Sequence, residues 1–326
     1  MGDVKSIDSL MRYLRDHKSI NINGSSQKRK LRNLGYYHGY KGYRFIKHKS
    51  NPIVYSDFNE IIAVNKLDME LKAMLYPKIM FLETALKNYV LEIVLKESNT
   101  SSFNAIYENH LTEYKNYTVG SRNYKSSLSK RLRLRDQVYN TLTREYANQK
   151  QVVEHFYHND LQVPIWAIFE VITLGSFGTF LSCMNTPLKR KISLELKLNQ
   201  PCDTNGVLTE NIVYLLKDLR NSVAHNSVVF DCRFKSNNIN NALMRCLESD
   251  MSIPNITFET IVDYIIIITY LLKSLGCSKI ELSSFVNEFE KSIDEFRGKV
   301  PISEYNKILY TDTRNKINLL KNYIKA

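Results

Sequence analysis

The stretch LDMELKAMLYPKIMFLETALKNYVLEIVLK, residues 67–96, decides the fold. Its apolar residues recur every three or four positions, a spacing that places them on one face of an α-helix. The apolar series comprises Leu67, Leu71, Met74, Leu75, Ile79, Leu82, Leu86, Val90 and Ile93. This pattern predicts a long helix from about residue 58 to residue 96. Pro77 predicts a kink or break near Tyr76, because proline lacks the backbone N–H that a helix uses.

Helical spacing recurs along most of the remaining chain. The expected helices cover residues 4–17, 127–151, 164–184, 189–198, 209–224, 257–275, 279–297 and 303–324. Residues 98–125 are polar and irregular, and we expect a loop or short turns there. The 326 residues include only 11 glycines and 7 prolines, and we find neither a convincing strand pattern nor an internal repeat. These features predict an all-α fold.

Two segments are apolar nearly all round and should lie in the core. The first begins at Pro164, where Gly175 and Gly178 would permit close helix packing. The second, residues 261–275, contains Asp263 and Lys273 and is shorter than the roughly 20 residues that span a bilayer. The first ten residues, MGDVKSIDSL, contain no apolar stretch of the secretory kind. We therefore expect a cytoplasmic protein without a membrane partner.

The cysteine and histidine spacings predict no metal and no cofactor. The five cysteines are widely spaced and contain no CxxC pair, which favours reduced thiols. His155 and His158, beside Glu154 and Asp160, could face one ion from a helix, but no third strong ligand follows at a diagnostic spacing. We interpret them as surface polar residues.

Basic charge is concentrated in two segments. The chain has a formal net charge of +12. Residues 1–60 contain 12 lysines and arginines against 5 acidic residues, and residues 114–150 contain 9 against 2. The rest is slightly acidic. Such segments suit a polyanion, either a nucleic acid or an anionic membrane surface, although a solvated surface has the same composition.

Residues 28–45, KRKLRNLGYYHGYKGYRF, mix cations with tyrosines. Glycines at 35, 39 and 42 argue against a regular long helix here. Aromatic rings among cations can stack on unpaired bases, or they can pack the segment onto the helical body. We interpret most of the tyrosines as structural and the cations as RNA contacts. The cations expected to contact RNA are Lys28, Arg29, Lys30, Arg32, Lys41 and Arg44, with Lys130, Arg131, Arg133 and Arg135 on a second basic face that could equally be a solvated helix face.

The segment LKDLRNSVAHN, residues 216–226, contains the residues best suited to chemistry. RNA cleavage without a metal needs one group to take the 2′-hydroxyl proton, another to protonate the leaving oxygen, and a cation for the phosphate. The unperturbed pKa of histidine, near 6.5, suits His225 to proton transfer. Arg220 stays charged and its guanidinium matches two phosphate oxygens.

The spacing between Arg220 and His225 is a constraint. Residues five apart on a helix differ by roughly 140° of rotation, whereas Asn221 and His225 share a face. Three arrangements could bring the two side chains together. The arginine side chain could reach around the helix, the helix could end between the two residues, or a two-fold dimer could assemble the site from two copies. The pattern alone is common, and His225 could simply cap the helix while Arg220 forms a surface salt bridge.

Three motifs in one order resemble the Abi-like branch of the HEPN superfamily. RNSVAHN, residues 220–226, is similar to its R-N-x-x-A-H-N/H signature. LRNLGYYHGYKGYRF, residues 31–45, resembles its N-terminal element with paired tyrosines and G-Y-x-x-F, and PIWAIFEVITLGSF, residues 164–177, resembles its P-x-W-x-x-x-E-x-x-x-x-G element. The resemblance covers roughly residues 28–230; the last third of the chain does not match it.

This resemblance implies a HEPN-like helical bundle with core helices at about 60–96, 127–150, 164–184 and 209–225. Residues 1–60 would pack across the bundle domain of residues 61–230, and residues 231–326 would form a helical extension. By the same resemblance the protein would be a metal-independent endoribonuclease of phage defence, leaving 2′,3′-cyclic phosphate and 5′-hydroxyl ends. Homodimers and a structured small regulatory RNA are the partners that the resemblance implies.

The resemblance also assigns roles to residues. Arg220 and His225 occupy the catalytic positions, Asn221 matches the polar residue after the arginine, and Asn226 would help to position groups. Glu83 would orient Arg220 or serve as a structural partner. Two other functions stay open. The protein could hold a structured RNA without cutting it, or it could be a protein-directed helical scaffold.

Overall fold

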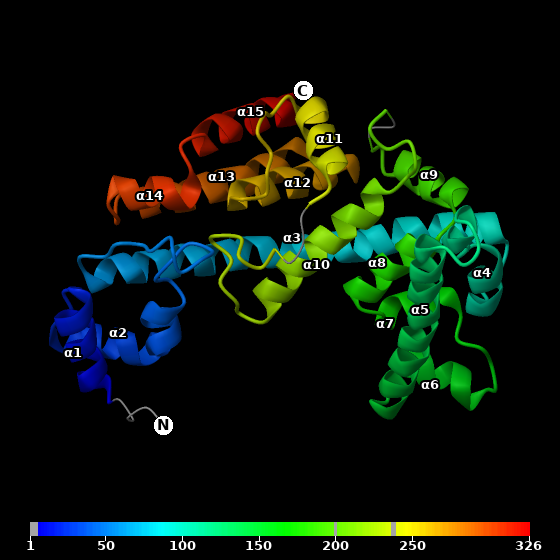
Figure 1. Ribbon diagram of the computed structural model, residues 1–326, viewed down its shortest axis with the longest axis horizontal. Helices are drawn as coiled ribbons and strands as arrows, with labels where there is room; N and C mark the ends of the chain where they lie inside the picture. The colour runs from blue at the N-terminus through cyan, green and yellow to red at the C-terminus, as the bar shows by residue number, and fades with distance from the viewer. Residues whose placement is uncertain (1–5, 199–200, 236–238) are drawn as a thin grey trace. The chain divides into compact units, whose positions relative to one another are not determined.

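The computed structural model describes residues 6–198, 201–235 and 239–326 (Figure 1). In this described part the chain is 71% helical, with 15 α-helices and no strand, which confirms the all-α prediction. The chain forms two compact units. Unit 1 comprises Met1–Lys78, Leu219–Asn238 and Met251–Ala326, and unit 2 comprises Ile79–Asp218 and Ile239–Asp250. Each unit is discontinuous in sequence, and the three-part division drawn along the chain stays a prediction.

The helices belong to the units as follows. Unit 1 contains α1 (Ile7–Lys18), α2 (Gly24–Tyr36), a π-helical turn η1 (Tyr37–Lys41), α12 (Ile261–Ser274), α13 (Lys279–Arg297), α14 (Ile302–Leu309) and α15 (Thr313–Lys325). Unit 2 contains α4 (Phe103–Asn109), a 3₁₀ turn η2 (Glu113–Asn116), α5 (Arg122–Ala147), α6 (Gln151–His158), α7 (Ile165–Val171), α8 (Leu174–Cys183) and α9 (Thr186–Glu195). Three helices contribute to both units: α3 (Phe58–Ser98), α10 (Leu208–Ala224) and α11 (Asn241–Met251).

Helix α3 confirms the prediction made from its apolar series. The chain does not break near Tyr76, because the helix continues through Pro77, and the alternative of a kink there stays a prediction. Proline removes one backbone hydrogen bond, but Leu75 and Ile79 on either side are fully buried, and their packing stabilises the helix here. The boundary between the two units follows directly after Lys78.

In unit 1, α12 is buried along almost its whole length and packs against α13 and α15 (Figure 1). Asp263 in α12 is fully buried and forms an ion pair of 2.8 Å with Lys316. Its other oxygen accepts hydrogen bonds from the backbone N–H groups of Thr257 and Phe258, at 3.0 and 2.8 Å. A charged residue in this helix therefore stays in the core because its bonding groups are satisfied. No described helix is both long and apolar enough to cross a membrane.

In unit 2, α5 packs against α6, α7 and α8. The single helix expected over residues 164–184 is wrong, because α7 ends at Val171 and Thr173 begins α8 as its N-cap, accepting from the Ser176 N–H at 3.1 Å. Gly178 does permit close packing: a Cβ at this position would lie 2.9 Å from the Tyr214 ring.

Three further differences from the predictions have local causes. Residues 98–125, expected to be irregular, contain α4, in which Phe103, Ile106 and Tyr107 share a buried face behind a Ser102 cap. Helix α11 was not predicted at all. The helix expected over residues 303–324 is two helices, because Tyr310 adopts a left-handed φ of 59° between α14 and α15.

Candidate functional site

Helix α10 ends in a Schellman motif built from its own sequence. The N–H of Asn226 donates to the Val223 carbonyl at 3.2 Å, and the N–H of Ser227 donates to the Ser222 carbonyl at 2.8 Å. Asn226 adopts a φ of 52°, the left-handed conformation that this motif requires and that asparagine adopts more readily than most residues. The asparagine after the histidine therefore fixes where the helix stops.

Helix α10 ends at Ala224, directly before His225, which is its C-cap residue. The N–H of His225 still donates to the Asn221 carbonyl at 2.9 Å, so helical geometry extends to the histidine. Asn221 and His225 lie one turn apart and are both exposed, whereas Arg220 is half-buried and lies roughly 140° away around the axis. The helix end at Ala224 does not by itself bring the two residues to one face, because the backbone stays helical as far as the His225 N–H. The arginine side chain would have to reach around the helix, or a second copy of the chain would have to supply it.

Lys72 on α3 ties the end of α10 to the body of unit 1. Its Nζ donates to Asn226 Oδ1 at 2.8 Å and forms an ion pair of 2.7 Å with Asp68 Oδ2. Asp68 Oδ1 accepts hydrogen bonds from the backbone N–H groups of Val229 and Phe230, at 2.7 and 2.9 Å. The chain is thus held on the C-terminal side of His225 by two side chains from one turn of α3.

The same aspartate also binds the tyrosine-rich segment. The Tyr43 hydroxyl donates to Asp68 Oδ2 at 3.2 Å and accepts from Asn65 Nδ2 at 3.0 Å. His38 Nδ1 lies 3.4 Å from the same hydroxyl. Burial, and then the Asp68 carboxylate, raise the pKa of Tyr43, so the hydroxyl keeps its proton. We call His38, Tyr43, Asn65, Asp68, Lys72 and Asn226 the Asp68 cluster; it joins two of the three sequence motifs within unit 1.

His38 is a titratable group that the sequence analysis did not single out. Burial lowers its pKa, and the Lys72 ammonium lowers it further, against the opposing effect of Asp68. A half-buried imidazole of this kind is neutral near pH 7. The sequence signal for the cluster was present: Asp68 and Lys72, four residues apart, interrupt an otherwise apolar helix face. Charges at such positions are kept because they have buried partners.

The basic, tyrosine-rich segment is more helical than predicted. It continues α2 to Tyr36, with an interruption at Gly35, where φ is 70°, and then forms the η1 turn. Tyr40 and Tyr43 are buried, in line with a structural role, while Tyr37 is half exposed. Lys28 forms an ion pair with Asp8 at 2.7 Å. The Arg44 guanidinium lies 5.6 Å from the Phe45 ring centroid, whereas the other predicted RNA-contacting cations, Arg29, Lys30, Arg32 and Lys41, are exposed.

The second set of predicted RNA contacts lies on α5 in unit 2. Lys130, Arg133 and Arg135 are exposed. Arg131 differs, since its Nη2 donates to the Tyr107 carbonyl at 2.8 Å and its guanidinium stacks 3.7 Å from the Tyr107 ring centroid. Arg131 therefore packs α5 onto α4, and the exposed cations of this helix remain predicted RNA contacts.

Glu83 is buried in unit 2 and forms an ion pair of 3.2 Å with Lys87. Lys87 also donates to the Ile172 carbonyl at 2.9 Å, at the end of α7. This geometry gives Glu83 a partner beside the PIWAIFEVITLGSF motif. Its predicted effect on Arg220 stays a prediction.

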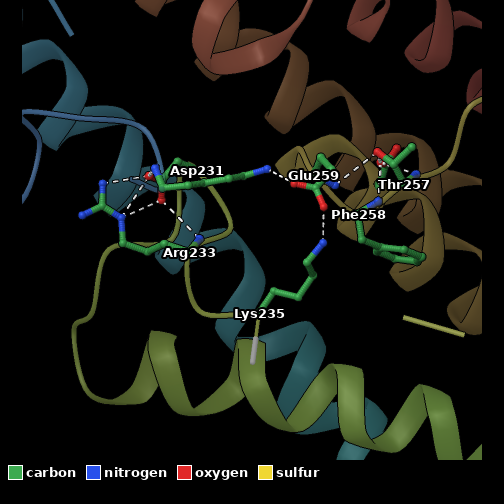
Figure 2. Close-up of polar contacts among 8 residues, drawn as sticks. Asp231, Arg233, Lys235, Thr257, Phe258 and Glu259 are labelled. Atoms are coloured by element: carbon green, nitrogen blue, oxygen red, sulfur yellow. Dashed lines mark hydrogen bonds and ion pairs between the residues drawn. The ribbon is translucent and has the colours of Figure 1, made fainter. Parts of the chain in front are cut away.

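A second polar network fixes the chain that follows α10 (Figure 2). Asp231 is buried and accepts from Arg233 Nε at 2.9 Å and from the backbone N–H of Lys47 at 2.6 Å. The Glu259 carboxylate lies between the ammonium groups of Lys47 and Lys235 and is paired with both. Burial alone would raise the pKa of Glu259, but the bonds from Lys235 and Lys47 outweigh it and lower the pKa. These residues have a structural role.

His155 and His158, considered above as metal ligands, lie at the surface of α6. His158 Nε2 is 3.3 Å from the Tyr146 hydroxyl. Among the described residues, no three His, Cys, Asp or Glu side chains gather in a geometry that could hold a metal ion.

The fold and the site together define a helical protein, 71% helical in its described part, with an arginine, an asparagine and a histidine near the capped end of α10. The family model described as Abi-like protein matches residues 29–231, more than half of the chain. The protein belongs to this family. The comparisons with curated proteins and with solved structures found no match.

Proposed function

We propose that this protein is an endoribonuclease of abortive infection, which defends a cell against phage by cleaving RNA without a metal ion once it is triggered. Membership of the Abi-like family supports the defence role. The observation that carries the chemistry is an exposed histidine, His225, on a helix end that Lys72 and Asp68 hold in place.

The proposed reaction is an in-line displacement within the RNA chain. A base removes the proton of a ribose 2′-hydroxyl, and the 2′-oxygen attacks the adjacent phosphorus. The bond from phosphorus to the 5′-oxygen breaks, and that oxygen takes a proton. The products are a 2′,3′-cyclic phosphate and a 5′-hydroxyl. No net oxidation occurs, and water is not consumed in this step.

The residues at the end of α10 suit these tasks. His225 is exposed, and an imidazole can take or give a proton near neutral pH. Asn221, one turn earlier on the same face, can donate to a phosphate oxygen. Arg220 can stabilise the extra negative charge of the pentacoordinate phosphate. Because Arg220 and His225 lie on different helix faces, a homodimer that joins His225 of one copy to Arg220 of the other satisfies the geometry.

One alternative has a specific observation in its favour. The exposed cations of α2 and α5 would hold a structured RNA whether or not it is cut. In that case Arg220 and His225 would be contacts rather than catalysts. Binding of this kind weakens steeply with salt and produces no new RNA ends.

The test is RNA cleavage in the presence of EDTA with mapped product ends. Total RNA is incubated with wild type, Arg220→Ala and His225→Ala after bound nucleic acid has been removed. Cleavage that survives EDTA, leaves cyclic phosphates and is lost in both variants would support the proposal. The matched control is His155→Ala, which removes another exposed histidine, in unit 2, and should cut like wild type.

Two results would count against the proposal. Cleavage that persists in His225→Ala would point to a contaminating nuclease. Tight RNA binding with no cleavage by wild type in infected-cell extract, where a trigger is present, would favour the binding function. Mixing Arg220→Ala with His225→Ala tests the dimer: if each site uses residues from two copies, mixed dimers regain part of the activity.

A further inference from the structure

Unit 2 contains a pocket of about 310 Å³ between α4, α5 and the chain that joins α6 to α7. Its inner surface is apolar, formed by Phe103, Leu142 and Ile168, all of which are buried. This volume is at the lower end of the roughly 300–1,000 Å³ typical of small-molecule sites. A flat, ring-sized group would fit in it.

Two tyrosines form the sides of this pocket and are exposed. Tyr139 and Tyr157 are 44% and 41% exposed. Burial, and then the neighbouring Tyr139 hydroxyl, raise the pKa of Tyr157, in line with two phenol groups close to each other. Each ring has one aromatic neighbour, since the Tyr139 and Phe103 centroids lie 6.4 Å apart and those of Tyr157 and Tyr146 lie 5.5 Å apart. Aromatic rings that are partly exposed beside an apolar floor can stack on nucleobases.

Amide side chains lie at the pocket rim. Asn104 Oδ1 accepts from the Tyr139 hydroxyl at 2.9 Å, and Gln162 Oε1 accepts from the Ser102 hydroxyl at 3.3 Å. With both oxygens used in this way, the two amide nitrogens can donate. Base edges present carbonyl and ring-nitrogen acceptors to such donors.

Arg135 lies on α5 one helical turn before Tyr139, which lines the pocket. Arg135 and Tyr139 are four residues apart on α5, so they share a face about 6 Å apart along the axis. Arg135 is exposed, and its guanidinium lies 5.8 Å from the Tyr107 ring centroid. The backbone of a strand whose base enters the pocket would therefore pass an arginine that can bind its phosphate.

We infer that this pocket binds one unpaired base of an RNA strand, with Tyr139 and Tyr157 stacking on the base and Arg135 contacting the neighbouring phosphate. The inference rests on the proposed function in that RNA is the ligand. It adds that the protein selects single-stranded or looped RNA, because a paired base cannot leave its helix without losing stacking and pairing energy.

The experiment measures RNA affinity without cleavage. The full chain carrying His225→Ala is titrated with a fluorescein-labelled ten-nucleotide single strand, and with the same strand annealed to its complement. Added to this background, Tyr139→Leu and Tyr157→Leu should each weaken single-strand binding roughly 5- to 100-fold, the usual effect of losing one base–aromatic stack. Tyr139→Phe, which keeps the ring, should bind within a few-fold of the parent.

The matched control is Tyr76→Leu, which removes a similarly exposed tyrosine from α3. It should leave affinity unchanged. Melting temperatures of all variants show whether any loss reflects unfolding, and Tyr157→Leu serves if Tyr139→Leu does not fold. Photo-crosslinking of the strand with 5-iodouridine should label Tyr139 or Tyr157.

Several results would overturn the inference. Unchanged affinity in both leucine variants, an equal loss for the duplex, or crosslinks confined to unit 1 would each do so. If wild type cleaves RNA and the pocket variants bind RNA normally, the pocket does not bind a base, but the proposed ribonuclease function stands. Pocket-dependent binding without cleavage by wild type would reject the enzyme and keep the pocket.

Discussion

Replacing Lys72 by methionine should destabilise unit 1 strongly, although methionine has a similar length. The Lys72 side chain is 6% exposed, and its ammonium bonds to Asp68 and Asn226. Without it, the fully buried Asp68 carboxylate keeps two backbone N–H donors and the Tyr43 hydroxyl but loses its counter-charge. Removing one member of a buried ion pair costs about 3–5 kcal/mol.

The assay is urea unfolding of the full chain, followed by circular dichroism. With a dependence on urea near the upper end of the usual ~1–3 kcal/mol per molar, the loss should lower the transition midpoint of unit 1 by about 1–2 M. Hydrogen exchange should also become faster in residues 226–230, because Asn226 loses its bond to Lys72 and the Asp68 carboxylate that binds Val229 and Phe230 loses its counter-charge.

Lys66→Met is the matched control for this prediction. Lys66 also lies on α3 and pairs with Glu70 at 3.2 Å and Glu295 at 2.6 Å, but its side chain is 46% exposed. Exposed pairs contribute little because water and salt screen them. The reasoning is refuted if both variants lose the same stability, or if Lys72→Met leaves hydrogen exchange at residues 226–230 unchanged.

Three further predictions test other features. The pKa of His38, followed by NMR, should rise in Lys72→Met yet stay below 6.5, because burial is the larger cause of its lowering; an unchanged value would contradict the assigned geometry. Because the pKa of Glu259 is lowered in the folded state, its contribution to stability is full above about pH 4.5 and is lost as the pH falls through the folded value. Glu259→Gln should therefore be less stable than wild type at pH 7, and the difference in the free energy of unfolding should shrink as the pH falls below about 4.5; a difference that widens in acid would refute this. Gly206→Ala should lower the melting temperature far more than Gly276→Ala. Both glycines have a positive φ, 70° and 84°, but only at Gly206 would an added Cβ clash, lying 2.4 Å from the backbone carbonyl carbon of Lys189. Equal shifts in melting temperature would disprove the clash.

Much of the fold could be predicted because local signals mark the helices. Helix α13 occupies the predicted residues, 279–297, because Ser278 and Glu281 form a capping box at its start. The division of residues 164–184 into two helices was missed for the opposite reason. Thr173 lies within a continuous apolar run, and only its bond to the Ser176 N–H makes it a cap.

The candidate site was predicted only in part. The R-N-x-x-A-H-N run is contiguous, so the sequence identifies Arg220 and His225 directly. The Asp68 cluster is not contiguous: Asp68 and Val229 are 161 residues apart, and no local pattern links them. Solvent exposure depends on the tertiary structure and could not be predicted from the sequence. Arg135 is exposed, whereas Arg131 is hydrogen-bonded to Tyr107. Whether these residues act on RNA stays a prediction.

The long sequence separation within the Asp68 cluster has a consequence during synthesis. At about 5–20 residues per second, a ribosome adds Val229 roughly 8–30 s after Asp68. Throughout that interval the Asp68 carboxylate has neither of its backbone donors, because Val229 and Phe230 have not yet been added. The arrangement that fixes His225 therefore forms only when more than two thirds of the chain exists. A nascent chain that stops short of Val229 cannot hold the end of α10 in this way.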